Sequence, residues 1–288
     1  RIIPAAKGHK FSVHHQPIGV VAAFSPWNFP MSQPARKIAG ALASGCSIIL
    51  KAAEETPAGA LHIARAFEDA GLPAGVLNLV FGDPAEISSH LIKQDPVRLV
   101  AFTGSTPVGR HLTTLASENM TSVLMELGGH APVIVFKNCD LDRAVAETMK
   151  AKFATSGQDC LGANRIFVER DIYDEFCTRF VAATQALTVG KGIDDPDIGP
   201  LMNEKAVQKQ EQHVADALEK GATLACGGNR HPLGPLFYEP TVLTDVPADA
   251  AILHEETFGP VAPITPFDTE DEVIQRANDS EYGLAAGV

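Results

Sequence analysis

Short apolar runs alternate along the chain with longer segments in which apolar residues recur at helical spacing. This alternation predicts an α/β fold with largely parallel sheets. The segment 56–71 has the clearest helix pattern. Thr56 can cap its start, Pro57 suits the first helical position and Gly71 follows its end. Early in the chain, strands are predicted at 18–26, 46–51, 76–81, 97–102 and 122–127, and a second helix at 33–45.

The same alternation begins again after a glycine pair at 128–129. A strand at 131–136 precedes a helix at 140–157, for which Asp140 is the expected cap. Later elements are predicted as a strand at 164–169 and helices at about 171–186 and 203–220. The glycine pair is therefore the expected junction between two domains. Residues 1–15 fit neither domain and are expected to form an outlying hairpin.

The composition is that of an ordinary globular protein, with 45% hydrophobic and 20% charged residues among 288. The net charge of −12 argues against nucleic-acid binding, because a phosphate backbone requires a basic surface. The five cysteines show neither C-x-x-C nor zinc-like spacing, which favours a reducing compartment such as the cytoplasm and no metal site. No apolar run has the length of a membrane span. The chain starts at Arg1 and stops within an apolar segment, so we expect a fragment truncated at both ends.

Two polar clusters follow predicted strands in the first half. In "SPWNFP" (25–30), two prolines flank Trp27 and Asn28, and a carboxamide on such a rigid loop can donate to a developing oxyanion. A simple turn asparagine is the alternative. In "ILKAAEETP" (49–57), Lys51 and Glu54 stand where an α/β sheet binds ligands. Glu54 can accept the ribose hydroxyls of NAD and would repel the extra phosphate of NADP, or the two charges are merely solvated.

Two further strand ends carry weaker signals. Ser105 in "FTGSTPVGR" (102–110) can cap a helix whose N-terminus holds a pyrophosphate, but no G-x-G-x-x-G or Walker motif is present and capping alone explains it. Glu126 in "MELGGH" (125–130) ends a strand, either as a general base with an exposed carboxylate or as a surface residue beside a turn.

Cys160 has unusual neighbours for a core cysteine, because the small and polar residues of "ATSGQDCLGANR" (154–165) offer little apolar packing. Backbone N–H groups in such a loop would favour the thiolate and hence a nucleophile, although many lone cysteines are inert. The other four cysteines lie in strand or helix patterns and are expected to be inert. In "HEETFGPV" (254–261), Glu256 and Phe258 would share one face of a strand and could hold a ribose and a nicotinamide ring, or the segment is only a turn.

The order of these motifs, P-W-N-F-P, K-x-x-E, F-T-G-S, E-L-G-G, G-Q-x-C and E-x-F-G-P-V, resembles the aldehyde dehydrogenase superfamily across nearly the whole chain. The separation of 34 residues between Glu126 and Cys160 also suits that family. The resemblance implies an incomplete Rossmann-like NAD-binding domain at 16–127 and an incomplete α/β catalytic domain at 128–288. It implies that residues 1–15 are part of an oligomerisation hairpin and that the full-length protein is a homodimer or homotetramer.

The resemblance also implies roles for individual residues. Cys160 would be the nucleophile, Glu126 the general base and Asn28 the oxyanion donor. The implied cofactor is NAD, with NADP disfavoured by Glu54. The implied cofactor-binding residues are Trp27, Lys51, Glu54, Ser105, Glu256 and Phe258. The family pattern K-P-A-E has proline second, where this chain has Ala52.

The second half is similar to the succinate-semialdehyde dehydrogenase branch, which clamps the substrate carboxylate with two arginines. Arg36 matches one of them, whereas the other position is Ala154 here. Gly162 stands where some relatives have a redox-active second cysteine, so we expect no such switch. The expected substrate is succinic semialdehyde or a similar small semialdehyde. An enzyme for uncharged aldehydes, a cofactor-free cysteine hydrolase and a non-catalytic structural relative remain as alternatives.

Overall fold

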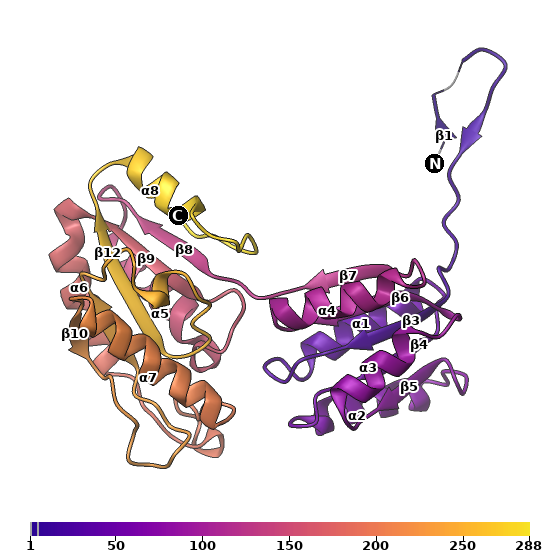
Figure 1. Ribbon diagram of the computed structural model, residues 1–288, viewed down its shortest axis with the longest axis horizontal. Helices are drawn as coiled ribbons and strands as arrows, with labels where there is room; N and C mark the ends of the chain where they lie inside the picture. Colours follow the sequence, from indigo (N-terminus) through magenta and orange to yellow (C-terminus); the bar gives the residue numbers. More distant parts are fainter. Residues whose placement is uncertain (1, 5) are drawn as a thin grey trace. The chain divides into compact units, whose positions relative to one another are not determined.

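A computed structural model of the chain describes residues 2–4 and 6–288. The chain divides into two compact units, Arg1–Leu127 and Gly128–Val288, and each is described by itself (Figure 1). Both units are layered arrangements of helices on a five-stranded sheet, which confirms the predicted α/β class. Among the described residues, no helix combines the length and the apolar character that crossing a membrane requires.

The first unit begins with a small hairpin. Strand β1 (Ile2–Ile3) pairs antiparallel with β2 (Phe11–Ser12), within the segment predicted as a hairpin. Arg1 and Ala5 of that segment lie outside the described residues. The part of this hairpin in oligomerisation stays a prediction.

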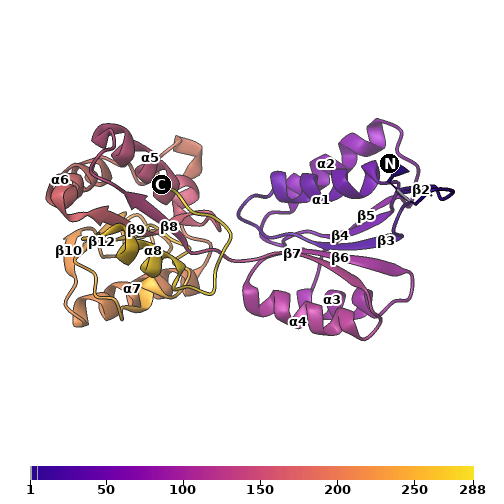
Figure 2. The same cartoon turned by 90° about the horizontal axis from the view of Figure 1, so that it is seen from above.

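The sheet of the first unit has the order β5-β4-β3-β6-β7, and all its neighbours are parallel. Consecutive strands run outward in one direction from β3 and in the other from β6, so the order reverses between these two central strands. Helices α1 and α2 cover one face and α3 and α4 the other (Figure 2). The strands are β3 (Val20–Phe24), β4 (Ile48–Lys51), β5 (Leu77–Val80), β6 (Val97–Thr103) and β7 (Ser122–Glu126). The helices are α1 (Ser32–Ala43), α2 (Pro57–Asp69), α3 (Pro84–Ile92) and α4 (Thr106–Ser117).

The second unit has a sheet of order β10-β11-β12-β9-β8, antiparallel only between β10 and β11. One face packs against α5 and α6 through a large apolar cluster, and the other against α7 and α8. The strands are β8 (Ala131–Val135), β9 (Ala163–Glu169), β10 (Thr223–Cys226), β11 (Thr241–Thr244) and β12 (Val261–Phe267). The helices are α5 (Leu141–Phe153), α6 (Arg170–Gln185), α7 (Glu204–Glu219) and α8 (Glu270–Asn278), with short 3-10 turns at Ala154–Gly157, Gly192–Asp194 and Ala251–Leu253.

Helix α5 shows how local sequence sets an element and where the prediction was wrong. Asp140 caps it as expected, with its carboxylate accepting the N–H of Arg143 at 3.1 Å. The helix ends at Phe153 rather than at 157. Thr155 and Ser156 take left-handed backbone angles (φ 55° and 58°), so the chain leaves the helix and enters the loop that carries Cys160.

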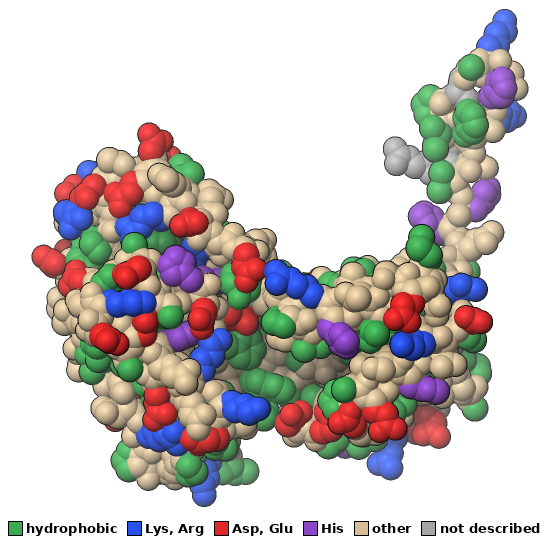
Figure 3. Space-filling view, in the orientation of Figure 1, with side chains coloured by type: hydrophobic (Ala, Val, Ile, Leu, Met, Phe, Trp, Pro, Cys, Tyr) green, Lys and Arg blue, Asp and Glu red, His purple; other side chains and the backbone are tan. Residues whose placement is uncertain are grey.

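Charged side chains are distributed over both units. On the face seen in Figure 3, acidic and basic side chains of the described residues are interspersed, and no broad patch of Lys and Arg forms there. This distribution fits the net charge of −12 and offers no basic platform for a phosphate backbone on that face.

Candidate functional site

In the first unit, the predicted site residues gather at one edge of the sheet. Trp27 and Asn28 follow β3, Glu54 follows β4, and Ser105 follows β6. Because the strands are parallel, their carboxyl ends share an edge, and the order reverses at its centre between β3 and β6. Ligands of open α/β sheets bind at such a position. The fold therefore brings the predicted residues of this unit together as a dinucleotide site would require.

Lys51 and Glu54 form an ion pair at this edge. The Lys51 ammonium lies 2.5 Å from one Glu54 oxygen, and the lysine side chain is buried whereas the carboxylate is 37% exposed. A pocket of about 220 Å³ opens beside the pair. The buried Ser25 hydroxyl in its wall has no hydrogen-bond partner among the described residues. Other residues that line it include Trp27, Thr103 and Gly104.

Ser105 takes the cap position of α4, but its side chain makes no capping hydrogen bond. Pro107 follows within the first turn, and the helix begins at Thr106. The hydroxyl of Ser105 is exposed and so remains accessible to a ligand. Arg36, the predicted substrate residue, lies exposed on α1. Among the described residues of the first unit, no contact pairs it with a second arginine as a clamp, and Ala154 belongs to the other unit.

Glu126 ends β7 with an exposed carboxylate, as predicted. Lys37 on α1 lies close enough to sense its charge. Burial lowers the pKa of Lys37 to about 8, although the Glu126 carboxylate opposes this shift. The Lys37 ammonium donates to the Thr103 hydroxyl at 2.5 Å. A basic group that titrates near neutral pH therefore stands beside the predicted general base.

In the second unit, Cys160 lies in the loop just before β9, half-buried and free of any disulfide. Burial, followed by the negative charges of Asp159 and Glu256, raises the pKa of the Cys160 thiol to about 11. The sequence predicted a loop that favours the thiolate. That expectation is wrong for this unit taken by itself, because the two carboxylates and the desolvation outweigh the backbone hydrogen bond that lowers the pKa.

Glu256 precedes β12 and points its carboxylate at the backbone of the glycine pair. The N–H of Gly129 donates to Glu256 Oε1 at 2.9 Å. Burial raises the pKa of Glu256, and this hydrogen bond and the charge of Lys209 oppose the rise. Lys209 on α7 also donates to the Glu256 carbonyl oxygen. Of the two alternatives for this segment, the structure has the turn and not the strand: residues 256–260 form a loop, and Phe258 has a left-handed φ of 49°.

Gly129 joins the nucleophile segment to this carboxylate. A Cβ atom at Gly129 would lie 1.9 Å from the Cys160 carbonyl oxygen, which is inside van der Waals contact. A Cβ atom at Gly128 would lie 3.0 Å from Glu256 Oε2. Only glycine fits this double approach. The second unit therefore holds Cys160 and Glu256 against one short backbone segment, at the amino ends of β8, β9 and β12.

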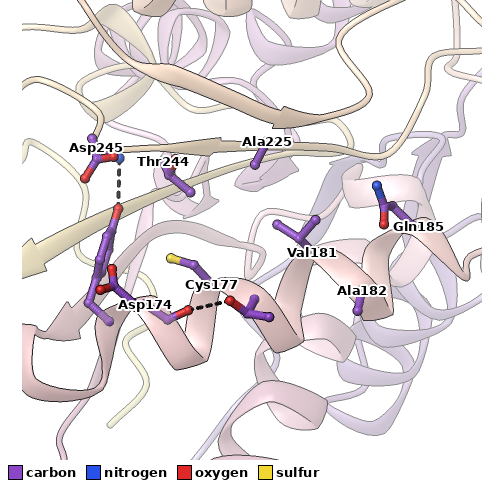
Figure 4. A pocket seen from close by; sticks show the side chains of 10 residues that line it. Asp174, Cys177, Val181, Ala182, Gln185, Ala225, Thr244 and Asp245 are labelled. Carbon is purple, nitrogen blue, oxygen red and sulfur yellow. Dashed lines mark hydrogen bonds between the residues drawn. The ribbon is translucent and has the colours of Figure 1, made fainter.

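Other cysteines lie away from these residues. Cys177 lines a shallow hollow of about 590 Å³ between α6 and the β10–β11 edge (Figure 4). Burial raises its thiol pKa to about 12. The Tyr173 hydroxyl in the same wall accepts the Asp245 N–H at 2.8 Å and donates to the Ile264 carbonyl at 3.3 Å. Cys139 lies exposed in a turn rather than in a strand or helix. Within the described part of the chain, no group of three or more His, Cys, Asp or Glu side chains is arranged to bind a metal.

Comparisons with known proteins agree with this arrangement. The aldehyde dehydrogenase family profile matches residues 1–288. This chain belongs to the aldehyde dehydrogenase family. The resemblance inferred from six ordered motifs is thereby confirmed.

Relatives within the family are about half identical to this chain over the residues that align. The 3-sulfolactaldehyde dehydrogenase of Pseudomonas putida is 50% identical over 275 residues, which are 95% of this chain and 57% of that protein. The NADP(+) succinate-semialdehyde dehydrogenase GabD of Escherichia coli (strain K12) is 48% identical over 272 residues, 94% of this chain and 56% of that protein. A crystal structure of succinate-semialdehyde dehydrogenase from Burkholderia pseudomallei matches with a TM-score of 0.97 and 47% identity, covering 99% of this chain and 60% of that one. The chain thus spans a little over half the length of these aldehyde dehydrogenases.

Two lysines beside candidate site residues were not predicted from the sequence. Lys37 and Lys209 lie beside Glu126 and Glu256, the carboxylates predicted for catalysis and for the cofactor. Each occupies an ordinary helix position in the sequence. In the sequence, each of the two is only a lysine within an amphipathic helix. Many surface lysines have the same surroundings, so the sequence does not distinguish these two from them.

Proposed function

We propose that this protein oxidises an aldehyde to a carboxylic acid with NAD or NADP, and that its substrate is a small aldehyde carrying an anionic group, such as succinic semialdehyde. Family membership over the full 288 residues carries the proposal. The polar residues that the family pattern assigns to catalysis and to the cofactor are present, whereas Ala52 and Ala154 depart from the family and branch patterns. The catalytic ones are Cys160, Glu126 and Asn28.

The residues of the first unit fit a nicotinamide dinucleotide. Glu54 keeps an exposed carboxylate for ribose hydroxyls beside its Lys51 partner. Ser25 lines the adjoining pocket, and its buried hydroxyl has no hydrogen-bond partner among the described residues. In the second unit Glu256 would hold the nicotinamide ribose and Phe258 the ring. When bound, the dinucleotide supplies the hydride acceptor. Glu54 favours NAD, because a carboxylate repels the 2′-phosphate of NADP, yet two relatives carry NADP(+) in their names.

The chain's own residues would divide the remaining chemistry. After the Cys160 thiol has released its proton to solvent, Sγ attacks the aldehyde carbon, and the Asn28 amide and the Cys160 N–H donate to the resulting oxyanion. The loss of one such donor typically raises the barrier by about 2.7–4 kcal/mol. Oxidation leaves a thioester on Cys160. Glu126 takes a proton from the water that hydrolyses this thioester, which releases the acid and regenerates the thiol.

Relatives support an anionic aldehyde as substrate. Those with 46% to 50% identity include enzymes named for succinate semialdehyde, glutarate semialdehyde and 3-sulfolactaldehyde, and each of these molecules carries an acidic group. Arg36 is the chain's candidate for binding that group. Ala154, at the position of the second arginine, argues for a looser clamp than in the succinate-semialdehyde branch.

The decisive experiment measures NAD and NADP reduction by the complete polypeptide that carries this sequence, with succinic semialdehyde and with butanal. Cys160→Ala should abolish turnover of both aldehydes while NAD binding persists, because the nucleophile is lost and the cofactor contacts are not. Turnover by Cys160→Ala would refute the mechanism. Equal kcat/KM for the two aldehydes would remove the anionic substrate and leave the dehydrogenase. The absence of NAD and NADP binding would favour a cofactor-free cysteine hydrolase.

A further inference from the structure

Lys152 is a buried lysine that the proposed chemistry does not use. It lies in the last turn of α5 with 0% of its surface exposed. Lysine is almost never buried completely, because desolvation of an ammonium group is costly. Here burial lowers the pKa of Lys152 to about 7. Because the burial of Lys152 is costly, we expect its side chain to hold a neighbouring group in place.

The Lys152 ammonium donates to Asn164 Oδ1 at 2.9 Å, and Asn164 on β9 is also completely buried. The charged ammonium form can only donate, so in that form this bond determines which end of the amide faces the lysine. The opposite end, Asn164 Nδ2, points to the Gly129 carbonyl oxygen at 3.5 Å. Lys152 thereby ensures that a donor, and not a second oxygen, faces the Gly129 carbonyl.

The backbone at Gly129 touches both functional segments of this unit. Its N–H binds Glu256 Oε1 at 2.9 Å, and its Cα packs against the Cys160 carbonyl. The next carbonyl along the chain, that of His130, accepts Arg165 Nε at 2.9 Å. Two successive residues of β9 therefore hold two successive carbonyls of the segment that leads into β8.

We propose that Lys152 is a positioning residue that fixes the Gly129 backbone through the amide of Asn164. Displacement of this peptide would move the amide that orients the Glu256 carboxylate and would loosen the packing behind the Cys160 loop. The inference rests on the proposed function, since Glu256 matters there as the ligand of the nicotinamide ribose. The competing explanation is that Lys152 only fills space in the core.

The first test is Lys152→Met in the complete polypeptide, with Lys150→Met as its matched control. Methionine has a similar length but no donor, and Lys150 is an exposed lysine on the same helix. We expect Lys152→Met to raise the KM for NAD about tenfold, the effect of losing one hydrogen bond to a charged group. Its thermal midpoint should change only modestly, because the removal of a buried charge offsets the loss of the donor to the buried Asn164 Oδ1. Lys150→Met should change neither quantity.

The second readout does not depend on turnover. Amide hydrogen exchange in the peptide that contains residues 128–130 should become faster in Lys152→Met and in Asn164→Leu, and should be unchanged in Lys150→Met. Lys152 and Asn164 act in series, so the double variant should match Lys152→Met in both exchange and KM. Asn164→Leu also keeps the test valid if Lys152→Met fails to fold.

The outcomes separate the inference from the proposed function. Wild-type exchange and wild-type KM in both Lys152→Met and Asn164→Leu would overturn the positioning role, as would strictly additive effects in the double variant. Faster exchange at 128–130 together with a raised KM would support it. If exchange increases but the wild-type protein oxidises neither succinic semialdehyde nor butanal, the proposed function fails, while the action of Lys152 on the Gly129 backbone stands.

Discussion

The two units place their candidate residues at opposite ends of their sheets. In the first unit, Asn28, Glu54 and Glu126 follow the carboxyl ends of parallel strands. In the second unit, Cys160 and Glu256 precede the amino ends of β9 and β12. The carboxyl ends of open α/β sheets are the usual location of ligand sites. The first unit follows this rule and the second does not.

The two sheet ends also differ in the partner of their buried lysine. Lys51 in the first unit pairs with Glu54, whose carboxylate stays 37% exposed and available to a ligand. Lys152 in the second unit instead donates to the neutral amide of Asn164, and every group between it and Glu256 is buried or half-buried. The carboxyl end of the first sheet exposes a charged carboxylate to solvent, whereas the groups at the amino end of the second sheet are buried or half-buried. Changes at the second end should therefore affect folding as well as activity.

The largest effect is expected for Gly129→Ala. The new Cβ would lie 1.9 Å from the Cys160 carbonyl oxygen, so one backbone segment must move. We expect a loss of about 3 kcal/mol or more in the free energy of unfolding of the second unit. Urea unfolding followed by far-ultraviolet circular dichroism measures it.

Gly40→Ala is the matched control for that change. Gly40 lies on α1 of the first unit, and no atom comes within 4 Å of a Cβ placed there. Alanine should stabilise this helix by about 0.5–1 kcal/mol. If Gly129→Ala were as stable as the wild type, the amino-end site would be as open as the carboxyl-end site and the comparison would fail.

The next effect concerns the reactivity of Cys160. Because its pKa is raised to about 11, the thiol stays protonated at neutral pH, and alkylation by iodoacetamide should accelerate as the pH rises. Between pH 7 and pH 10 the rate should increase about a thousandfold, tenfold per unit, because the thiolate fraction does so below the pKa. Mass spectrometry of the peptide that contains Cys160 follows the reaction.

Unfolded chain provides the reference for this profile. In urea, the rate at the same peptide should level off above about pH 9, where an ordinary thiol is already ionised. A plateau below pH 8 in the folded chain would show a stabilised thiolate. The second unit would then activate its cysteine instead of keeping it neutral.

This contrast between the two sheet ends explains which site residues could be predicted from the sequence. Strands appear in the sequence as apolar runs, and the end of each run marks the end of a strand. Lys51 and Glu54 could therefore be placed at a ligand-binding edge from the local pattern alone. Cys160, Gly129 and Glu256 come together only through the packing of three strands that are far apart in the sequence. The roles proposed for Cys160 and Glu256 came from the order of family motifs and not from periodicity, and Gly129 was predicted only as part of a domain junction.

Two errors have the same origin. The helix predicted to 157 ends at Phe153, because two non-glycine residues adopt left-handed angles that no propensity predicts. The thiolate expected at Cys160 is opposed first by burial, then by the neighbouring Asp159 and then by Glu256, a carboxylate 96 positions away. The local sequence shows neither these backbone angles nor this burial, and it does not show the burial of Lys152 or its bond to Asn164 either.

The smallest expected effect, on Lys51→Met, probes the open end of the comparison. The variant removes the buried partner of Glu54 without unpacking the sheet, because methionine retains the length of the stem. We expect NAD to bind about tenfold more weakly, since the carboxylate loses the hydrogen bond that orients it toward the ribose. The free energy of unfolding should change by less than about 1 kcal/mol, as for a partly exposed pair.

Lys93→Met, which breaks an exposed pair with Glu118 in the same unit, is the control and should leave NAD affinity unchanged. Isothermal titration calorimetry with NAD decides the matter. Equal affinity in the Lys51 and Lys93 variants would show that the carboxyl-end pair is only a solvated ion pair, and the cofactor role of Glu54 would lose its support.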